Sequence, residues 1–384
     1  MPMQTIFDFR LPTHLIHGPG SIARLARLFT PNDKILIVTD KNLVAAGIVD
    51  RVTQVLGGAQ IPSTVFDGVL VNPRAKCAHG GHRQYVAEKC TAIVAVGGGS
   101  PMDAAKMVGV LAANGGRIES YLGLNKFEHD LPPLICVPTT YGTGSEVTPF
   151  AVMTNPKSRN KDAVVSWKAV PRGGILDPEL AVGLPASVGG ATGMDALTHA
   201  LESYVNLMAT PLTETIALSA IRLVAANVRL ACANDYELEA TENMLIASAL
   251  AGVAFAQTRL GNVHAMSHPV GAFYDAHHGT VNAVLLPYVM EFNLTARVDK
   301  YAALAEALGT DTRGISPQEA AHLAIDAVCE LNQDLGIPDR LGELGVQARS
   351  IPAMARRTMD SPNVEVNPRK TAQEDIVRIF KTAL

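Results

Sequence analysis

The chain has 384 residues, and at roughly 150 residues per domain this length predicts two or three domains. Hydrophobic residues make up 48% of the sequence, which is enough to build sizeable cores. The 32 Lys and Arg residues against 36 Asp and Glu residues give a net charge of −4, and no basic run could follow a phosphate backbone. These values favour a folded globular protein and argue against nucleic acid as a partner.

Signals for secretion and membrane insertion are weak. Residues 1–12 mix acidic and basic side chains and contain no apolar core of a signal peptide. The longest strongly apolar stretch, 244–256, has 13 residues, fewer than the ~18 needed to span a bilayer. The 5 cysteines are widely spaced and form no C-x-x-C pair, as expected for reduced thiols. We therefore expect a cytoplasmic protein with no membrane partner.

The first 180 or so residues alternate between short apolar runs and helical stretches, which is typical of βα units with a parallel sheet. The runs expected to be strands are 34–40, 63–66, 92–96 and 134–138. Polar or glycine-rich turns follow several of them. Ligands bind outside the carboxyl ends of the strands in such sheets, so these turns are the expected binding site.

Beyond about Leu184, strand-like runs become scarce and apolar residues recur at helical spacing, for example over 217–233, 240–256 and 298–308. The glycine- and proline-containing segment 183–190 is a plausible junction. The sequence therefore predicts an α/β domain over residues 1–183 and an all-α domain over residues 184–384.

A glycine-rich turn, Gly97–Gly99, follows one expected strand and precedes a helix. We expect Ser100 to be the N-cap, Pro101 the first helical residue and Asp103 the acidic partner of a capping box. Free N–H groups at such a turn favour phosphate oxygens. The turn does not match G-x-G-x-x-G, because Met102 stands at the third glycine position, so a tight turn without a ligand is an equal alternative.

Asp40 closes a different expected strand. An acid there can accept hydrogen bonds from a ribose 2′-hydroxyl and would repel a 2′-phosphate, which favours NAD over NADP. An ordinary turn aspartate is the alternative.

A cluster of histidines and one aspartate suggests a metal site. Asp195 and His199 are four residues apart, on one face of a helix, and His264 and His268 have the same spacing in an apolar setting. Structural roles for the first pair remain an alternative. A carboxylate with imidazoles suits Fe(II) or Zn(II) better than Mg²⁺ or Ca²⁺.

Several long motifs in one order carry a resemblance to a known family. They span residues 97–103, 138–146, 193–199, 264–269 and 278–279. Together they resemble the iron-containing, group III alcohol dehydrogenases, and within that family most of all the lactaldehyde reductases (propanediol oxidoreductases). The resemblance implies an α/β dinucleotide-binding domain followed by an all-α metal-binding domain, a fold shared with dehydroquinate synthase.

The resemblance also assigns residues. The implied metal ligands are Asp195, His199, His264 and His278. His268 would lie beside the nicotinamide and substrate as the catalytic histidine, and His277 stays unassigned. The implied NAD(H)-binding residues are Asp40, Asn72, Gly97, Gly98, Gly99, Ser100, Asp103, Thr139, Thr140, Thr143 and Lys161. Phe150 and Phe255 match positions near the substrate pocket.

The implied activity is hydride transfer between a short primary alcohol or diol and NAD⁺, with Fe(II), or Zn(II), as the Lewis acid that stabilises the alkoxide. The expected substrates are of the lactaldehyde and 1,2-propanediol type, with 1,3-propanediol or methanol as alternatives. Departures from the family pattern at Arg74, Tyr141, Phe150 and Asn363 leave the substrate open. A lyase similar to dehydroquinate synthase and a non-enzymatic metal- or nucleotide-binding protein are the other hypotheses.

The family also implies a homodimer or higher homo-oligomer. The amino-terminal run 5–9 has the alternation of an edge strand that could pair with a second subunit.

Overall fold

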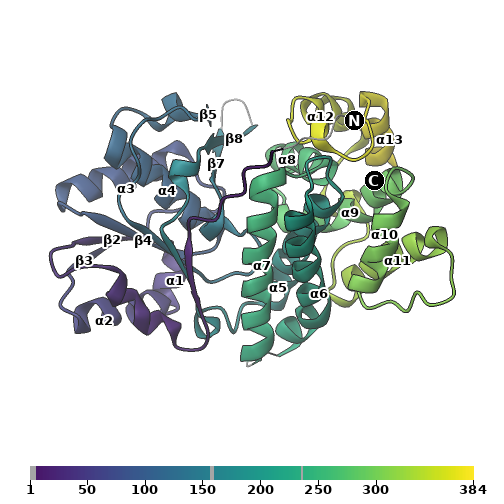
Figure 1. Cartoon of the computed structure of the whole chain (residues 1–384). Helices are drawn as coiled ribbons and strands as arrows, with labels where there is room; N and C mark the ends of the chain where they lie inside the picture. The colour runs from purple at the N-terminus through teal and green to yellow at the C-terminus, as the bar shows by residue number, and fades with distance from the viewer. Residues whose placement is uncertain (1–5, 156–159, 235–236) are drawn as a thin grey trace.

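The computed structural model describes residues 6–155, 160–234 and 237–384. Figure 1 shows two parts side by side: a sheet flanked by helices, formed by the first half of the chain, and a group of helices formed by the second half. The expected fold class, an α/β part followed by a helical part, is confirmed.

The larger sheet has six parallel strands in the order β1-β9-β6-β4-β2-β3. Their bounds are β1 His14–His17, β2 Ile35–Val38, β3 Ser63–Phe66, β4 Ala92–Gly97, β6 Leu134–Pro138 and β9 Gly173–Leu176. The four strands expected from the sequence, β2, β3, β4 and β6, are all present. Alternate residues of β2 enter two separate cores, with Ile35 and Ile37 on one face of the sheet and Leu36 and Val38 on the other. Helices therefore cover both faces.

Helices α1 to α4 connect these strands. Their bounds are α1 Lys41–Ala45, α2 Ile48–Gly58, α3 Ala75–Ala87 and α4 Gly99–Asn114. A smaller sheet has three strands in the order β5 (Gly123–Leu124), β8 (Asn160–Val165) and β7 (Phe150–Asn155), and β7 packs against α4. Five short 3₁₀ helices lie in this part: η1 Ser21–Leu28, η2 Ile118–Tyr121, η3 Ser145–Val147, η4 Trp167–Ala169 and η5 Pro178–Leu180.

From Ala186 onward, every regular element among the described residues is helical. The α-helices are α5 Ala186–Val205, α6 Pro211–Ala233, α7 Leu238–Thr258, α8 Asn262–Tyr274, α9 His278–Leu294, α10 Val298–Ala307, α11 Pro317–Asp334, α12 Ile351–Met359 and α13 Gln373–Thr382. The short helices are η6 Leu341–Leu344, η7 Ala348–Ser350 and η8 Val364–Val366. One large apolar core unites them, and α5, α7 and α9 contribute many of its residues. The proposed division near Leu184 falls between β9 and α5.

Helix α6, most of which the sequence predicted as a helix over 217–233, is long and apolar enough to cross a membrane by length and composition alone, which the sequence analysis did not expect. The bent pair α7 and α8 passes the same test only if it is taken as one broken span. In this structure α6 packs on α5 and α7 and contributes Ala217, Ile221, Val224 and Val228 to the apolar core. Core helices of soluble proteins pass this test too, so it is weak evidence for a membrane.

Residues 6–13 form no regular secondary structure in the single chain, and Thr5 lies outside the described residues. Gln257 on α7 exchanges two hydrogen bonds with the Arg10 backbone, at 3.2 and 2.8 Å, which ties this segment to the helical part. Ile6 and Phe7 are exposed. An edge strand here is not formed within one subunit, so its pairing with a second subunit stays a prediction.

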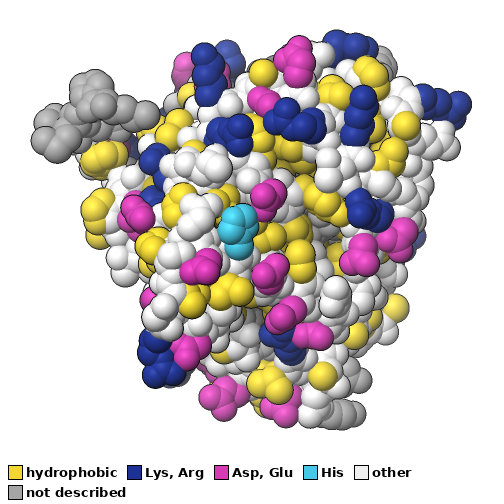
Figure 2. Space-filling view, turned by 90° about the vertical axis from the view of Figure 1, so that its right-hand side faces the viewer, with side chains coloured by type: hydrophobic (Ala, Val, Ile, Leu, Met, Phe, Trp, Pro, Cys, Tyr) yellow, Lys and Arg dark blue, Asp and Glu magenta, His cyan; other side chains and the backbone are white. Residues whose placement is uncertain are grey.

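Figure 2 shows the outer face of the helical part, where acidic and basic side chains are interspersed. Lys and Arg gather along its upper edge, at the height of α12 and α13 in Figure 1, without forming a continuous strip across the face. This face offers no basic track for a phosphate backbone.

Candidate metal centre and cofactor cleft

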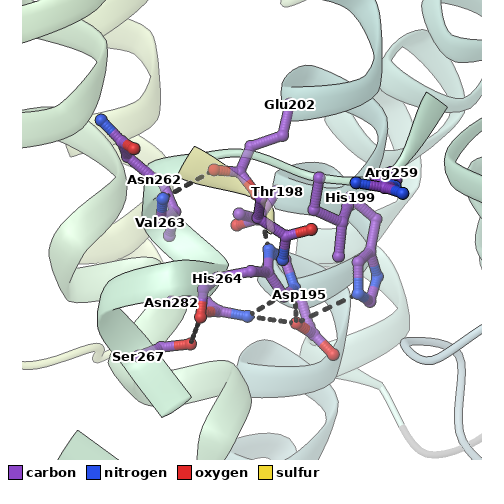
Figure 3. A network of polar contacts seen from close by, with 12 residues as sticks. Asp195, Thr198, His199, Glu202, Arg259, Asn262, Val263, His264, Ser267 and Asn282 are labelled. Carbon is purple, nitrogen blue, oxygen red and sulfur yellow. Dashed lines mark hydrogen bonds and ion pairs between the residues drawn. The ribbon is translucent and has the colours of Figure 1, made fainter. Parts of the chain in front are cut away.

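Three helices bring the acid and the histidines of the candidate metal centre together (Figure 3). Asp195 and His199 lie four residues apart on α5, His264 is on α8, and His278 is the first residue of α9. The first three are almost fully buried, with exposed fractions of 4%, 5% and 1%. One ligand atom from each of these three lies within 4.8 Å of the other two. Among the four expected ligands, the sequence spacing alone could place only Asp195 and His199 on one helix face, because the helical period relates residues of the same helix only.

The spacing around the Asp195 carboxylate suits a small cation. Its Oδ1 lies 3.9 Å from His199 Nε2, 3.6 Å from His264 Nε2 and 4.0 Å from His278 Nε2. Metal bonds of about 2.1 Å in a tetrahedral site place neighbouring ligand atoms about 3.4 Å apart. Relative to Asp195 Oδ1, each Nε2 therefore needs to move by only about half an ångström, but the cluster with all ligand atoms within 4.8 Å of one another contains Asp195, His199 and His264 and not His278.

Hydrogen bonds at the opposite ring nitrogens orient the three imidazoles. His199 Nδ1 donates to the Gly142 carbonyl at 3.1 Å, and His264 Nδ1 donates to Glu202 Oε2 at 2.7 Å. Ser267 Oγ donates to the His264 carbonyl, so its lone pair is free to accept from His278 Nδ1 at 3.4 Å. With the protons held at Nδ1, each Nε2 presents its lone pair to the centre, as a metal ligand must.

Asn282 lies one turn after His278 on α9, and its side-chain nitrogen faces three possible hydrogen-bond acceptors of the centre. Its Nδ2 lies 2.7 Å from Asp195 Oδ1, 3.0 Å from His264 Nε2 and 3.2 Å from His278 Nε2. When the imidazoles are neutral with Nε2 free, as metal binding requires, three acceptors face an amide nitrogen that has only two hydrogens. Asn282 Oδ1 is buried and is among the side-chain atoms without a hydrogen-bond partner. A cation among these atoms would satisfy the remaining lone pairs, so the residues fit a bound metal.

The imidazoles differ in their protonation. Burial lowers the pKa of His199 to about 4 and lowers the pKa of His278 well below its usual value, so both rings are neutral near pH 7. Burial also lowers the pKa of His264, but hydrogen bonds to Asp195 and Glu202 outweigh it and raise this pKa to about 9. Burial raises the pKa of Asp195, yet the three histidines lower it by more, so it stays ionised. The metal-free centre thus holds one extra proton, on His264.

His268 lies next to this centre, not within it. Its ring stacks on that of His278 with centroids 5.4 Å apart and meets the His264 ring edge-on at 6.3 Å. Burial, followed by the charge of His264, lowers the pKa of His268 to about 3. A neutral, half-buried imidazole therefore lies beside the expected ligands. His277 is exposed, and its Nδ1 lies 3.4 Å from Thr280 Oγ1.

An aromatic wall closes the other side of the centre. Phe255 on α7 stacks on His199 at 4.5 Å between centroids, and Phe150 of β7 stacks on Phe255 at 5.9 Å. The two phenylalanines expected near a substrate pocket are therefore brought together beside a candidate ligand. Their rings keep water away from the His199 side.

The glycine-rich turn and the threonine loop lie side by side at the carboxyl end of the main sheet. Gly97 pairs with Pro138 in the β4–β6 register, and Thr139 N donates to the Gly97 carbonyl at 3.1 Å. A Cβ on Gly98 would lie 2.9 Å from Thr140 Oγ1, and a Cβ on Gly99 would lie 2.8 Å from Thr143 Cγ2. Side chains at these glycines would fill the space where the two loops meet.

The expected capping pattern at the start of α4 is wrong in detail. The helix begins at Gly99 with Gly98 as its N-cap, without a side-chain cap, so Ser100 lies in the first turn. Asp103 does not close a capping box, because it is half-buried and accepts from Ser145 Oγ at 2.8 Å and from Val152 N at 3.0 Å. Three glycines let the backbone turn directly into the helix, which therefore starts two residues earlier than expected.

Three other residues expected to contact a cofactor, Asp40, Asn72 and Lys161, make hydrogen bonds within the protein. Asp40 is the N-cap of α1, and its Oδ1 accepts from Asn42 N at 2.8 Å and from Leu43 N at 3.2 Å. Lys161 Nζ on β8 donates to Asn72 Oδ1 at 2.5 Å. The Asn72 amide in turn donates to Asp275 Oδ1, at the end of α8, at 3.2 Å. This chain of contacts joins the α/β part to the helix that carries His264.

Two residues around the centre, Glu202 and Asn282, were not singled out from the sequence. Glu202 is three residues after His199 on α5, and Asn282 is four residues after His278 on α9. Helical spacing places both on the faces of the expected ligands, a signal that the sequence contained.

A surface cavity of about 630 Å³ lies apart from this centre, between α8, α12 and the start of α13. Its lining residues are Phe273, Ala353, Arg356, Arg357, Met359, Asp360 and Gln373. None of the expected ligands or cofactor-binding residues lines it, so the convergent polar groups, rather than cavity size, identify the site.

A parallel sheet with a glycine-rich turn, next to a buried carboxylate and imidazole cluster on helices, defines a nucleotide-dependent metalloenzyme as the class of protein. Residues 12–178 match the family described as iron-containing alcohol dehydrogenase, and residues 190–384 match the carboxyl-terminal part of the Fe-containing alcohol dehydrogenase family. The chain belongs to the iron-containing alcohol dehydrogenase family and is an oxidoreductase.

Individual relatives agree with this assignment. The 1,3-propanediol dehydrogenase of Citrobacter freundii is 44% identical over 98% of this chain and 99% of its own length. The lactaldehyde reductase of Escherichia coli K12 is 38% identical over 91% and 92%. A crystal structure of a 1,3-propanediol oxidoreductase superposes with a TM-score of 0.96 at 42% identity, covering 99% of this chain and 100% of that one. Of these relatives, the propanediol enzyme shares more residues with the chain.

Proposed function

We propose that the protein interconverts short primary alcohols or diols and the matching aldehydes with NAD(H), using a divalent metal held by Asp195, His199, His264 and His278. The observation that carries the proposal is the convergence of three Nε2 atoms on one buried carboxylate, with the protons fixed on the far side of each ring. Membership of the iron-containing family implies iron and NAD as cofactors. Zn(II) suits the same nitrogen and oxygen donors.

The metal and the nicotinamide supply the chemistry. When bound, a divalent metal lowers the pKa of the alcohol hydroxyl, and the nicotinamide ring accepts a hydride from the carbinol carbon. The residues of the chain hold and orient the two partners and keep water out. Burial of Asp195, His199 and His264 strengthens the electrostatic contacts between them.

The cofactor would lie along the carboxyl end of the main sheet. Backbone N–H groups at Gly97–Gly99 and the amino end of α4 favour the pyrophosphate, and Thr140 and Thr143 flank this turn. Asp40 uses Oδ1 for its cap bonds, so Oδ2 is placed to accept from a ribose hydroxyl. The other proposed cofactor contacts are Asn72, Ser100, Thr139 and Lys161. Asp103 would support the turn indirectly, because its carboxylate accepts a hydrogen bond from Ser145 Oγ.

His268 would carry the proton of the alcohol. Its ring stacks on that of His278 with centroids 5.4 Å apart, so it lies close enough to the proposed ligands to take part in a relay of this proton towards solvent. In the direction of aldehyde reduction, the steps reverse.

The substrate would lie between the centre and the wall formed by Phe150 and Phe255. Their stacked rings make this side of the centre apolar. The lactaldehyde and 1,2-propanediol type is the primary proposal, and 1,3-propanediol and methanol are the alternatives.

A screen of purified protein tests this function. Metal-loaded protein is mixed with NAD⁺ and short alcohols or diols, and with NADH and short aldehydes, while absorbance at 340 nm is followed. We expect reduction of NAD⁺ by at least one primary alcohol, with NADP⁺ used less well. Absence of any change with all substrates, in protein that retains metal, would leave only a binding function.

Two further proposals concern the state of the protein. The extended segment 6–13 would pair with its counterpart in a second subunit, which would give a homodimer or a higher homo-oligomer. The free cysteines, of which Cys77, Cys90 and Cys136 are buried, support a cytoplasmic location. Analytical ultracentrifugation of the full chain tests the first proposal, and a sedimentation coefficient of a monomer would contradict it.

A further inference from the structure

Beyond the four proposed ligands, the centre contains a second buried acid. Glu202 lies on α5, three residues after His199, and only 4% of its surface is exposed. Both of its oxygens accept hydrogen bonds: Oε1 from Val263 N at 2.6 Å, and Oε2 from His264 Nδ1 at 2.7 Å. The carboxylate therefore accepts hydrogen bonds from two adjacent residues in the first turn of α8, one of which is a proposed ligand (Figure 3).

The chain keeps space open for this contact. A Cβ on Gly261 would lie 2.8 Å from Glu202 Oε1, so a larger residue just before α8 would push the carboxylate away. Among the ion pairs of the described residues, Glu202 is joined only to His264 and to no Lys or Arg. The burial of an acid without a basic partner is costly unless another cation compensates it.

With a divalent ion bound, the charges of the centre add up to zero only when the carboxylate of Glu202 is included. Asp195 contributes one negative charge and the three imidazoles contribute none when they act as ligands. A divalent ion held by these four side chains would leave one positive charge in a buried site. Glu202 supplies the second negative charge 2.7 Å from the ring of a proposed ligand.

The hydrogen-bond partner of His264 Nδ1 also differs in charge from the partners of the other two imidazoles. The Nδ1 atoms of His199 and His278 face neutral oxygens, the Gly142 carbonyl and the Ser267 hydroxyl. Only His264 donates to a carboxylate, and a charged acceptor makes a shorter and stronger bond than a neutral one. A ring that donates to an anion is also a better electron donor at Nε2.

We infer that Glu202 is a positioning residue for the metal: it fixes the tautomer and orientation of His264 and supplies the charge that makes the buried site neutral with a divalent ion. The inference rests on the proposed metal centre. It predicts that the affinity for the metal depends on a residue that does not contact it.

Metal-free protein is titrated with Zn(II) in competition with a chromophoric chelator, without NAD or alcohol. We expect Glu202→Gln to bind Zn(II) about 10- to 100-fold more weakly than the unaltered protein. Ser267→Ala removes the neutral partner of a neighbouring ligand, so its loss should be smaller. Glu146→Gln, which alters an equally buried acid outside the centre, is the matched control and should bind within about twofold of the unaltered protein.

Co(II) gives a second readout, because its visible absorption reports the arrangement of the ligands. Glu202→Gln should change this spectrum, and Glu146→Gln should not. If Glu202→Gln does not fold, Glu202→Asp takes its place; it keeps the charge but is one methylene too short to hold both Val263 N and His264 Nδ1. Circular dichroism and thermal unfolding of the metal-free variants establish that they are folded.

The outcomes separate the two proposals. If the unaltered protein binds neither Zn(II) nor Co(II), the proposed metal centre fails, and the inference fails with it. If the unaltered protein binds but the folded Glu202 variant has the same affinity and the same Co(II) spectrum, only the inference is overturned. A lower melting temperature with unchanged affinity shows a purely structural role and overturns it too.

Discussion

The contact between α9 and α5 at Gly279 makes a sharp test of the geometry of the centre. Gly279 follows His278 and packs against the backbone of the helix that carries Asp195. A Cβ at this position would lie 2.9 Å from the carbonyl carbon of Ala191, closer still to its oxygen, and 3.4 Å from Asp195 Cβ. Because the obstructing atoms are backbone, no side-chain rotation can make room for Gly279→Ala.

The size of the effect follows from these distances. Carbon atoms in contact lie about 3.5 to 4.0 Å apart, so α9 must move from α5 by about 0.6 to 1 Å. Metal sites tolerate errors of only about 0.2 Å in ligand distance. The shift would carry His278 out of reach of an ion held by Asp195 and would destabilise the fold by about 1 to 3 kcal/mol, the usual cost of overpacking.

Two measurements on Gly279→Ala check this reasoning: the free energy of unfolding of the metal-free protein in urea, and the affinity for Zn(II). Gly57→Ala is the matched control, because Gly57 lies in α2 and an added methyl group there would meet no neighbouring heavy atom within 4 Å. The control should be as stable as the unaltered protein or more so, with unchanged affinity. Equal stability and equal Zn(II) affinity of the two variants would refute the packing of α9 on α5 described above.

Three further predictions concern separate parts of the chain. His264→Ala should abolish metal retention and turnover together, measured by metal analysis and by absorbance at 340 nm; an active, metal-replete variant would remove His264 from the ligand set. Asp40→Gly should raise the use of NADPH relative to NADH, and an unchanged ratio of kcat/KM values would contradict the role of Asp40. Burial raises the pKa of Glu146 from 4.5 to about 7, so the unaltered protein should lose stability as the pH rises through this window. The Gln side chain of Glu146→Gln stays neutral, so the free energy of unfolding of this variant minus that of the unaltered protein should increase from pH 5 to pH 8. At 1.36 kcal/mol per pKa unit, the increase is at most about 3 kcal/mol. A difference that does not vary with pH would show that Glu146 keeps an ordinary pKa.

Three of the four strands that the sequence predicted correctly, β2, β4 and β6, are fully buried, whereas β3 is an edge strand of intermediate burial. β2 and β4 are continuous apolar runs, and such runs are a strong signal in a parallel sheet. β1 and β9 were missed because β1 begins and ends with histidine and β9 begins with two glycines. Their strand conformation comes from pairing with each other and with β6, which no local pattern reveals.

The candidate centre was predictable in its parts and not in its assembly. The spacing of Asp195 and His199 placed both on one face of a helix, and this pair is adjacent in the structure. That α8 and α9 bring His264 and His278 to the same carboxylate depends on helix packing, and only the family resemblance indicated it. The link between Asn72, Lys161 and Asp275 joins three elements far apart in the sequence and had no local signal.

The central claim is that a metal held by one carboxylate and three imidazoles is required for hydride transfer to NAD⁺. The most direct test follows the absorbance at 340 nm with NAD⁺ and a primary alcohol that the protein oxidises, before and after a chelator has removed the metal. We predict that removal abolishes NADH formation and that added Fe(II) or Zn(II) restores it. NADH formation at an unchanged rate in protein shown to be free of metal would contradict the claim.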